Sequence, residues 1–91
     1  MSDEEGVVTI VEIYTKQFCP FCWRALDLLG SKSIALKEIA IDGNSQLRAL
    51  MIERANGRST VPQIFIRGEH VGGCTDLFRL EQEGMLDQML R

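Results

Sequence analysis

The chain has 91 residues, the length of one small domain, and 45% hydrophobic with 25% charged residues is ordinary globular composition. The net charge is -3 and the ten basic residues are scattered along the chain, so the clustered positive surface that a nucleic-acid partner requires is missing. No apolar stretch approaches the roughly 20 residues of a membrane helix, and the acidic start is unlike a basic export leader. We therefore expect one domain over residues 1–91, located in the cytoplasm, with neither nucleic acid nor a membrane as partner.

The first half of the chain is typical of a strand, a helix and a second strand. Residues 7–14 are rich in β-branched and aromatic residues and predict a buried strand. From Pro20 onward the apolar positions follow helical spacing, and Gly30 stands where a helix would end. Residues 36–41 predict the second strand. Because a helix connects the two strands, we expect them to be parallel.

The second half adds a helix, a hairpin and a helical end. Residues 42–45 predict a turn, and residues 47–55 predict a helix that ends near Asn56-Gly57. Residues 61–66 predict a third strand, 67–70 a hairpin turn, and Val71 lies in a short fourth strand closed by Gly72-Gly73. One or two helices follow around Gly84. The fold class is therefore α/β, a four-stranded mixed sheet flanked by helices.

Two of the three cysteines, Cys19 and Cys22, lie at the predicted start of the first helix. Unpaired N–H groups and the positive end of the helix dipole favour thiolate over thiol at Cys19. Pro20 suits the first helical position, and Cys22 lies one turn on, within disulfide reach. This pattern predicts that Cys19 is the nucleophile and that the more buried Cys22 is the resolving thiol.

A Cys-x-x-Cys pair alone is also typical of zinc sites and of simple buried cysteines. The other soft ligands, His70 and Cys74, form a His-x3-Cys pair beyond a strand and a turn, which is poor spacing for zinc. A preceding strand, a helix start and a proline within the pair favour redox chemistry instead. We expect no metal.

Two further segments each allow a structural and a functional interpretation. Pro62 stands at a strand start, either as edge protection, which spacing alone favours, or after a cis Val61–Pro62 bond that leaves Val61 free to pair with a peptide. Residues 72–76 form either a glycine turn capped by Thr75 or Asp76, or a loop whose N–H groups favour a ligand carboxylate while Asp76 holds an amine.

Four single side chains are also open to interpretation. Lys16 either supports the thiolate and a ligand carboxylate or is simply solvated. Cys74 is expected to be a small buried residue and His70 a surface residue of the hairpin. Trp23 lies either exposed beside the site or in the core.

Four segments in order resemble a glutaredoxin of the dithiol class over essentially the full length. They are Tyr-Thr-Lys at 14–16, Cys-Pro-Phe-Cys at 19–22, Thr-Val-Pro at 60–62 and Gly-Gly-Cys-Thr-Asp at 72–76. The resemblance implies a thioredoxin-like fold and glutathione as electron donor. It also implies a monomeric oxidoreductase that reduces protein-glutathione mixed disulfides, which is deglutathionylation, and protein disulfides.

The resemblance also implies roles for residues around the cysteines. Pro62 would be cis, Val61 would pair with the cysteine backbone of glutathione, and Thr75 and Asp76 would hold its γ-glutamyl end. The implied glutathione-binding residues are Lys16, Phe21, Thr60, Val61, Pro62, Gly73, Cys74, Thr75 and Asp76.

The glycine carboxylate of glutathione would face Lys16 by the same resemblance. Arg48 or Arg58 would add to that contact, and the resemblance does not choose between them.

The chain departs from the family pattern at two positions and leaves two alternative functions. Phe21 stands where tyrosine is common, and Thr75 where an acidic residue is frequent. Cys-Pro-Phe-Cys differs from the Cys-Gly-Phe-Ser of monothiol relatives that carry iron-sulfur clusters, so cluster transfer is one alternative. A thioredoxin reduced by a flavoprotein reductase is the other, although Phe18 precedes Cys19 and the Trp-Cys-Gly-Pro-Cys pattern is missing.

Overall fold

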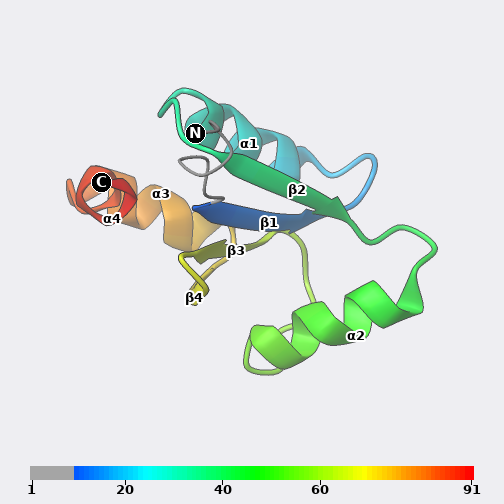
Figure 1. The fold of residues 1–91 in the computed structure, drawn as a ribbon. Coiled ribbons are helices and arrows are strands. Elements are labelled where there is room, and N and C mark those ends of the chain that lie inside the picture. The colour runs from blue at the N-terminus through cyan, green and yellow to red at the C-terminus, as the bar shows by residue number, and fades with distance from the viewer. Residues whose placement is uncertain (1–9) are drawn as a thin grey trace, which may run out of the picture.

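The computed structural model describes residues 10–91, and at its centre is a four-stranded sheet in the order β2-β1-β3-β4. β1 (Val11–Thr15) is parallel to β2 (Leu36–Ala40) and antiparallel to β3 (Gln63–Ile66), which is antiparallel to β4 (Glu69–Gly72) (Figure 1). The connection from β1 to β2 is α1 (Pro20–Gly30), with the bounds that its apolar spacing predicts. The mixed sheet and its parallel first pair are thus confirmed.

One face of the sheet is covered by α1 together with α3 (Cys74–Gln82) and α4 (Leu86–Leu90). Val11 and Ile13 of β1 are fully buried there, in a cluster with Ala25 and Leu29 of α1. Their alternation along β1 follows from the strand's period of two, which directs every second side chain to the same face. Residues 7–9 of the predicted first strand lie outside the described residues.

The other face of the sheet carries α2 (Ser45–Arg54). Tyr14 and Phe65 are buried there with Met51 of α2. The guanidinium of Arg54 lies 4.1 Å from the centre of the Phe65 ring, donates to Tyr14 Oη at 2.8 Å and pairs with Glu12 Oε1 at 2.7 Å. A charged residue is therefore tolerated in the middle of β1 because α2 supplies its partner.

Several element boundaries differ from the prediction, and three of these differences lie beside the turns of the chain. Ser45 begins α2 instead of ending a turn, since the Asn44 side chain caps the helix by accepting from Leu47 N at 3.0 Å. β3 starts at Gln63, two residues later than predicted, after a cis Val61–Pro62 bond. The hairpin turn is only two residues long, and β4 begins at Glu69.

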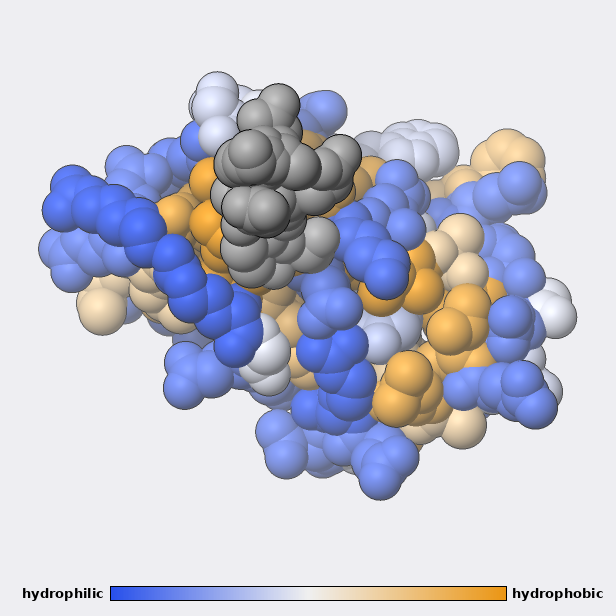
Figure 2. All heavy atoms as spheres, in the orientation of Figure 1, coloured by the Kyte–Doolittle hydropathy of each residue, from blue (hydrophilic) through white to orange (hydrophobic). Residues whose placement is uncertain are grey.

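The C-terminal region forms two helices on either side of Gly84, whose φ of +73° is a left-handed conformation that glycine adopts readily. This arrangement confirms the predicted break. Within residues 10–91 we find no helix long and apolar enough to cross a membrane. In the orientation of Figure 1, the surface is mostly hydrophilic with small apolar areas between the charged side chains (Figure 2).

Candidate functional site

The sheet topology brings three chain segments to one end of the molecule. Tyr14, near the end of β1, pairs with Gln63 at the start of β3, and Ile64 pairs with Gly72 at the end of β4. The segments that follow β1, precede β3 and follow β4 therefore meet at this end. They carry the cysteine pair, the Val61–Pro62 bond and the start of α3, and we call this the functional end.

At the functional end, Cys19 and Cys22 are joined as a disulfide with their Cα atoms 5.2 Å apart, an ordinary separation for such a bond. Cys19 is the N-cap residue of α1, and its Sγ accepts the backbone N–H of Cys22 at 3.2 Å. Cys22 is fully buried, whereas Cys19 is half-buried. The preceding residue, Phe18, has a φ of +53° and is 84% exposed, so a left-handed backbone residue turns the chain into the helix.

Pro62, at the same end of the molecule, is buried. Its peptide bond with Val61 is cis, as the family resemblance implies and contrary to the edge-protection role that spacing alone favours. The Val61 carbonyl oxygen lies 4.0 Å from Cys19 Sγ. The backbone of Val61 thus lies beside the Cys19 sulfur, before the ladder of β3 begins.

A shallow cavity of about 290 Å³ opens at this point. It is lined by Phe21, Arg58, Thr60, Val61, Pro62, Gly73, Cys74, Thr75 and Asp76. Every residue that the family resemblance implies for glutathione, except Lys16, is in this set. Lys16 lines a separate hollow together with Arg48, so the cavity contains Arg58 and not Arg48.

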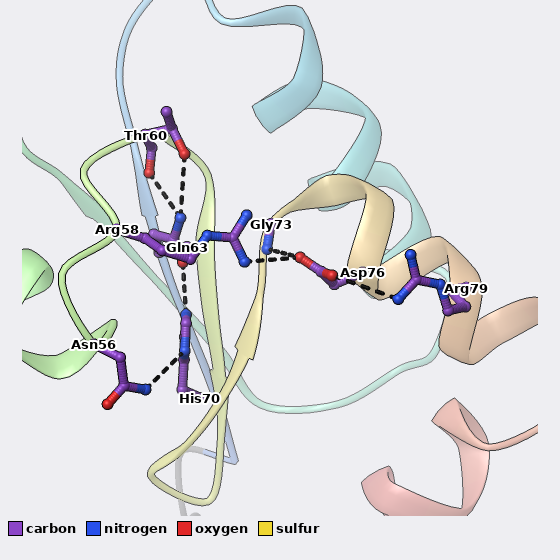
Figure 3. Close-up of polar contacts among 8 residues, drawn as sticks. All are labelled: Asn56, Arg58, Thr60, Gln63, His70, Gly73, Asp76 and Arg79. Atoms are coloured by element: carbon purple, nitrogen blue, oxygen red, sulfur yellow. Dashed lines mark hydrogen bonds and ion pairs between the residues drawn. The ribbon is translucent and has the colours of Figure 1, made fainter.

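The charged groups of the cavity are Asp76 and Arg58 (Figure 3). Asp76 Oδ2 accepts the Gly73 backbone N–H at 2.8 Å and pairs with Arg58 Nη1 at 3.0 Å. Arg79 Nη1 is 3.9 Å from the other carboxylate oxygen. The Gly73 hydrogen bond, followed by the Arg58 charge, lowers the pKa of Asp76 below its ordinary value despite partial burial.

The third cysteine, Cys74, is the first residue of α3 and contributes to the cavity wall. It is buried and free, as predicted, and this burial raises the pKa of its thiol. Trp23 is 52% exposed, which settles its place on the surface and not in the core.

Two residues that the sequence analysis did not assign to the site, Gln63 and His70, form a polar chain that leads to Thr60 of the cavity wall (Figure 3). Gln63 is fully buried, and its amide contacts both Thr60 and His70. His70 lies in the hairpin as predicted, but in its strand β4 and not at the open surface: it is half-buried, and its ring centre is 5.1 Å from that of Phe65. The sequence did contain a signal for Gln63: it is the one polar residue of a strand whose other residues are all apolar, and a buried polar side chain needs a hydrogen-bond partner.

Comparison with known proteins identifies the family. The Glutaredoxin family model matches residues 11–71. The chain is 54% identical over 81 residues to Glutaredoxin 3 of Escherichia coli (strain K12), covering 89% of this chain and 96% of that protein. It is 51% identical over 80 residues to the glutaredoxin of Pseudomonas aeruginosa, covering 88% and 94%.

Solved structures agree with these relatives. The dithiolic glutaredoxin 2-C-Grx1 of Trypanosoma brucei brucei superposes with a TM-score of 0.83 at 36% identity, over 91% of this chain and 88% of that one. A buckwheat glutaredoxin in complex with glutathione gives 0.79 at 29% identity, over 88% and 74%. The fold is therefore thioredoxin-like, and the chain belongs to the glutaredoxin family of glutathione-dependent disulfide oxidoreductases.

Proposed function

We propose that glutathione binds in the cavity beside Cys19, where the cysteine pair exchanges disulfides with it. One observation carries the assignment to these residues: Val61 of the cavity wall has its carbonyl oxygen 4.0 Å from the Cys19 sulfur, and the cavity contains backbone, cationic and anionic groups suited to a tripeptide. The likeness to a glutaredoxin whose structure includes glutathione supports the same placement.

In this proposal, the backbone of Val61 pairs with the cysteine residue of glutathione, because Val61 lies outside the sheet ladder. The first-turn N–H groups of α3 receive the γ-glutamyl carboxylate, and Asp76 holds its ammonium group. Arg58, which lines the cavity, binds the glycine carboxylate of glutathione. Lys16 contributes from the neighbouring hollow.

Reduction of a glutathionylated protein then needs only Cys19. Its thiolate attacks the glutathione sulfur of the mixed disulfide, forming a Cys19–glutathione disulfide while the protein cysteine leaves as a thiolate and takes up a proton. The thiolate of a second glutathione attacks the bound glutathione sulfur. Oxidised glutathione leaves, and Cys19 returns as a thiolate.

Reduction of a protein disulfide needs both cysteines. Cys19 attacks one substrate sulfur and forms a mixed disulfide, and the Cys22 thiolate then displaces the substrate by attacking the Cys19 sulfur. The product is the Cys19–Cys22 disulfide present in the structure. Two molecules of glutathione return it to the dithiol and become oxidised glutathione.

We further propose that the protein acts as a monomer in the cytoplasm on glutathionylated or disulfide-containing proteins. A reducing compartment keeps the pair available as a dithiol, which is the form that attacks substrates.

The test compares two electron donors for one small mixed disulfide. The reduced protein is supplied with glutathione, glutathione reductase and NADPH in one assay, and with thioredoxin reductase and NADPH in the other. We expect turnover only with glutathione. Turnover only with thioredoxin reductase would preserve the cysteine roles but would contradict the assignment of the cavity to glutathione.

A further inference from the structure

Gln63 is the buried polar residue closest in sequence to Pro62, and its side-chain amide connects two parts of the molecule. Its Nε2 lies 3.0 Å from the Thr60 carbonyl oxygen and 3.4 Å from Thr60 Oγ1. Its Oε1 lies 2.7 Å from His70 Nε2 (Figure 3). Because its side chain is fully buried, each of these contacts must pair a donor with an acceptor.

The orientation of the Gln63 amide follows from the chemistry of Thr60. A backbone carbonyl oxygen can only accept, so the group facing it must be the NH₂ of the amide. The amide oxygen then faces His70 and can only accept as well. His70 must therefore donate from Nε2, which assigns the proton of the neutral ring to that nitrogen.

The other ring nitrogen is consistent with this assignment. His70 Nδ1 lies 3.4 Å from Asn56 Nδ2, and an amide nitrogen only donates, so Nδ1 accepts and carries no proton. The charged groups that act on the ring are Arg58 and Asp76. Burial and the Arg58 charge lower the pKa of His70, while Asp76 opposes them, so the surroundings favour the neutral ring.

The hydrogen bonds thus run in one direction from Asn56 through His70 and Gln63 to Thr60. Neither His70 nor Gln63 lines the cavity, but Thr60 and the two residues after it do. Thr60 is itself exposed, so side-chain packing does little to hold it. The Gln63 amide adds a side-chain hydrogen bond between Thr60 and the first residue of β3.

We propose that His70 and Gln63 are positioning residues of the glutathione site: the Nε2–H form of His70 orients the Gln63 amide, which holds Thr60 and so presents Val61 to the ligand. This inference rests on the proposed binding of glutathione in the cavity. By this inference, β4 contributes to ligand binding through His70, although no residue of β4 lines the cavity.

Two substitutions at His70 separate the hydrogen bond from the ring. His70→Phe keeps a ring against Phe65 but has no N–H, whereas His70→Gln keeps an N–H donor at a similar reach. The full chain is assayed for deglutathionylation of a peptide with glutathione, glutathione reductase and NADPH. We expect His70→Phe to raise the KM for the peptide about five- to tenfold with kcat within about twofold, and His70→Gln to stay near the wild-type KM.

A second measurement does not depend on variants. Imidazole ¹⁵N and ¹³C chemical shifts of the wild-type protein distinguish the two neutral forms of histidine, and we expect the Nε2–H form.

If thermal denaturation shows that His70→Phe does not fold, Gln63→Met, which has no amide, replaces it with the same expected rise in KM.

Equal KM values for His70→Phe and His70→Gln would overturn the positioning role, as would an Nδ1–H imidazole. A wild-type protein without glutathione-dependent turnover would instead overturn the proposed function and with it the role of His70 in that site. The chemical shifts would still decide whether the hydrogen-bond chain runs as inferred, so the two failures are distinguishable.

Discussion

The helices α1 and α3 both begin at the functional end, and each has a cysteine at its start, yet the two cysteines differ in their surroundings. Cys19 caps α1, is half-buried and accepts the Cys22 N–H through its sulfur. Cys74 is the first residue of α3 and is buried, and burial raises the pKa of its thiol. At α3, the backbone N–H of the N-cap residue Gly73 donates to the Asp76 carboxylate.

The comparison indicates that proximity to a helix N-terminus does not by itself activate a sulfur. A backbone N–H directed at the sulfur and access to solvent both favour a reactive thiolate, and of these two cysteines Cys19 has both features. At the start of α3, the backbone N–H of Gly73 is directed at the Asp76 carboxylate instead of at a sulfur. In the proposed function, the start of α1 is therefore the site of reaction and the start of α3 is a site of binding.

The largest expected effect comes from removing the sulfur at the α1 start. Cys19→Ser should abolish reduction of both mixed disulfides and protein disulfides, because a hydroxyl is not ionised near pH 7. Cys22→Ser is the matched control and should lose only the reduction of protein disulfides. Coupled assays with the two substrates measure this, and equal losses in both variants would contradict the division of roles.

At the α3 start, Gly72→Ala should destabilise the protein by about 2 kcal/mol. Gly72 has a φ of +122°, and a Cβ there would overlap the Asp76 carboxylate and lie 2.9 Å from Arg58 Nη1. Gly57→Ala is the control, since Gly57 also has a positive φ, of +93°, but no atom within 4 Å of the added Cβ.

Urea denaturation compares these two glycine variants. If Gly57→Ala costs as much stability as Gly72→Ala, the backbone conformation alone explains the loss. The crowding of Asp76 and Arg58 would then have no measurable part in it.

The contrast between the two sulfurs can be measured directly by alkylation. In the reduced protein near pH 7, Cys74 should react with iodoacetamide at least about tenfold more slowly than Cys19, since burial both raises its pKa and blocks access. Mass spectrometry of peptides over time gives the two rates. Comparable rates would mean that the α3 start activates its cysteine as well.

The smallest expected effect is that of the carboxylate charge. Asp76→Asn should lower stability by about 1 kcal/mol near pH 7. The folded-state pKa of Asp76 is depressed, so its stabilisation is present above the ordinary value of 3.8 and is lost as pH falls through the lower folded value. The difference between variant and wild type should therefore shrink in acid.

Urea denaturation across this pH range tests the effect, with Asp27→Asn as control. Asp27 is exposed and makes no ion pair within residues 10–91. A difference for Asp76→Asn that does not change with pH would assign the loss to something other than the charge.

Local patterns in the sequence predicted much of this molecule. The helix of residues 20–30 followed from apolar spacing, with a proline at its start and a glycine at its end, and these signals act within a few residues of one another. The same local reading placed Cys19 at the helix start, where the structure has it. The family resemblance, and not spacing, led to the cis bond at Pro62 and to the residues of the cavity.

What the sequence by itself determined were the elements, the redox pair and the family. The tertiary structure alone decided that Arg58 and not Arg48 joins the cavity, that Asp76 is held by Arg58, and that Gln63 connects His70 to Thr60. Arg58 and Asp76 are 18 positions apart and Cys19 and Val61 are 42 apart. Strand register sets such distances, and a hydrogen bond between distant polar groups leaves no periodic trace in the sequence, because each partner alone resembles an ordinary surface residue.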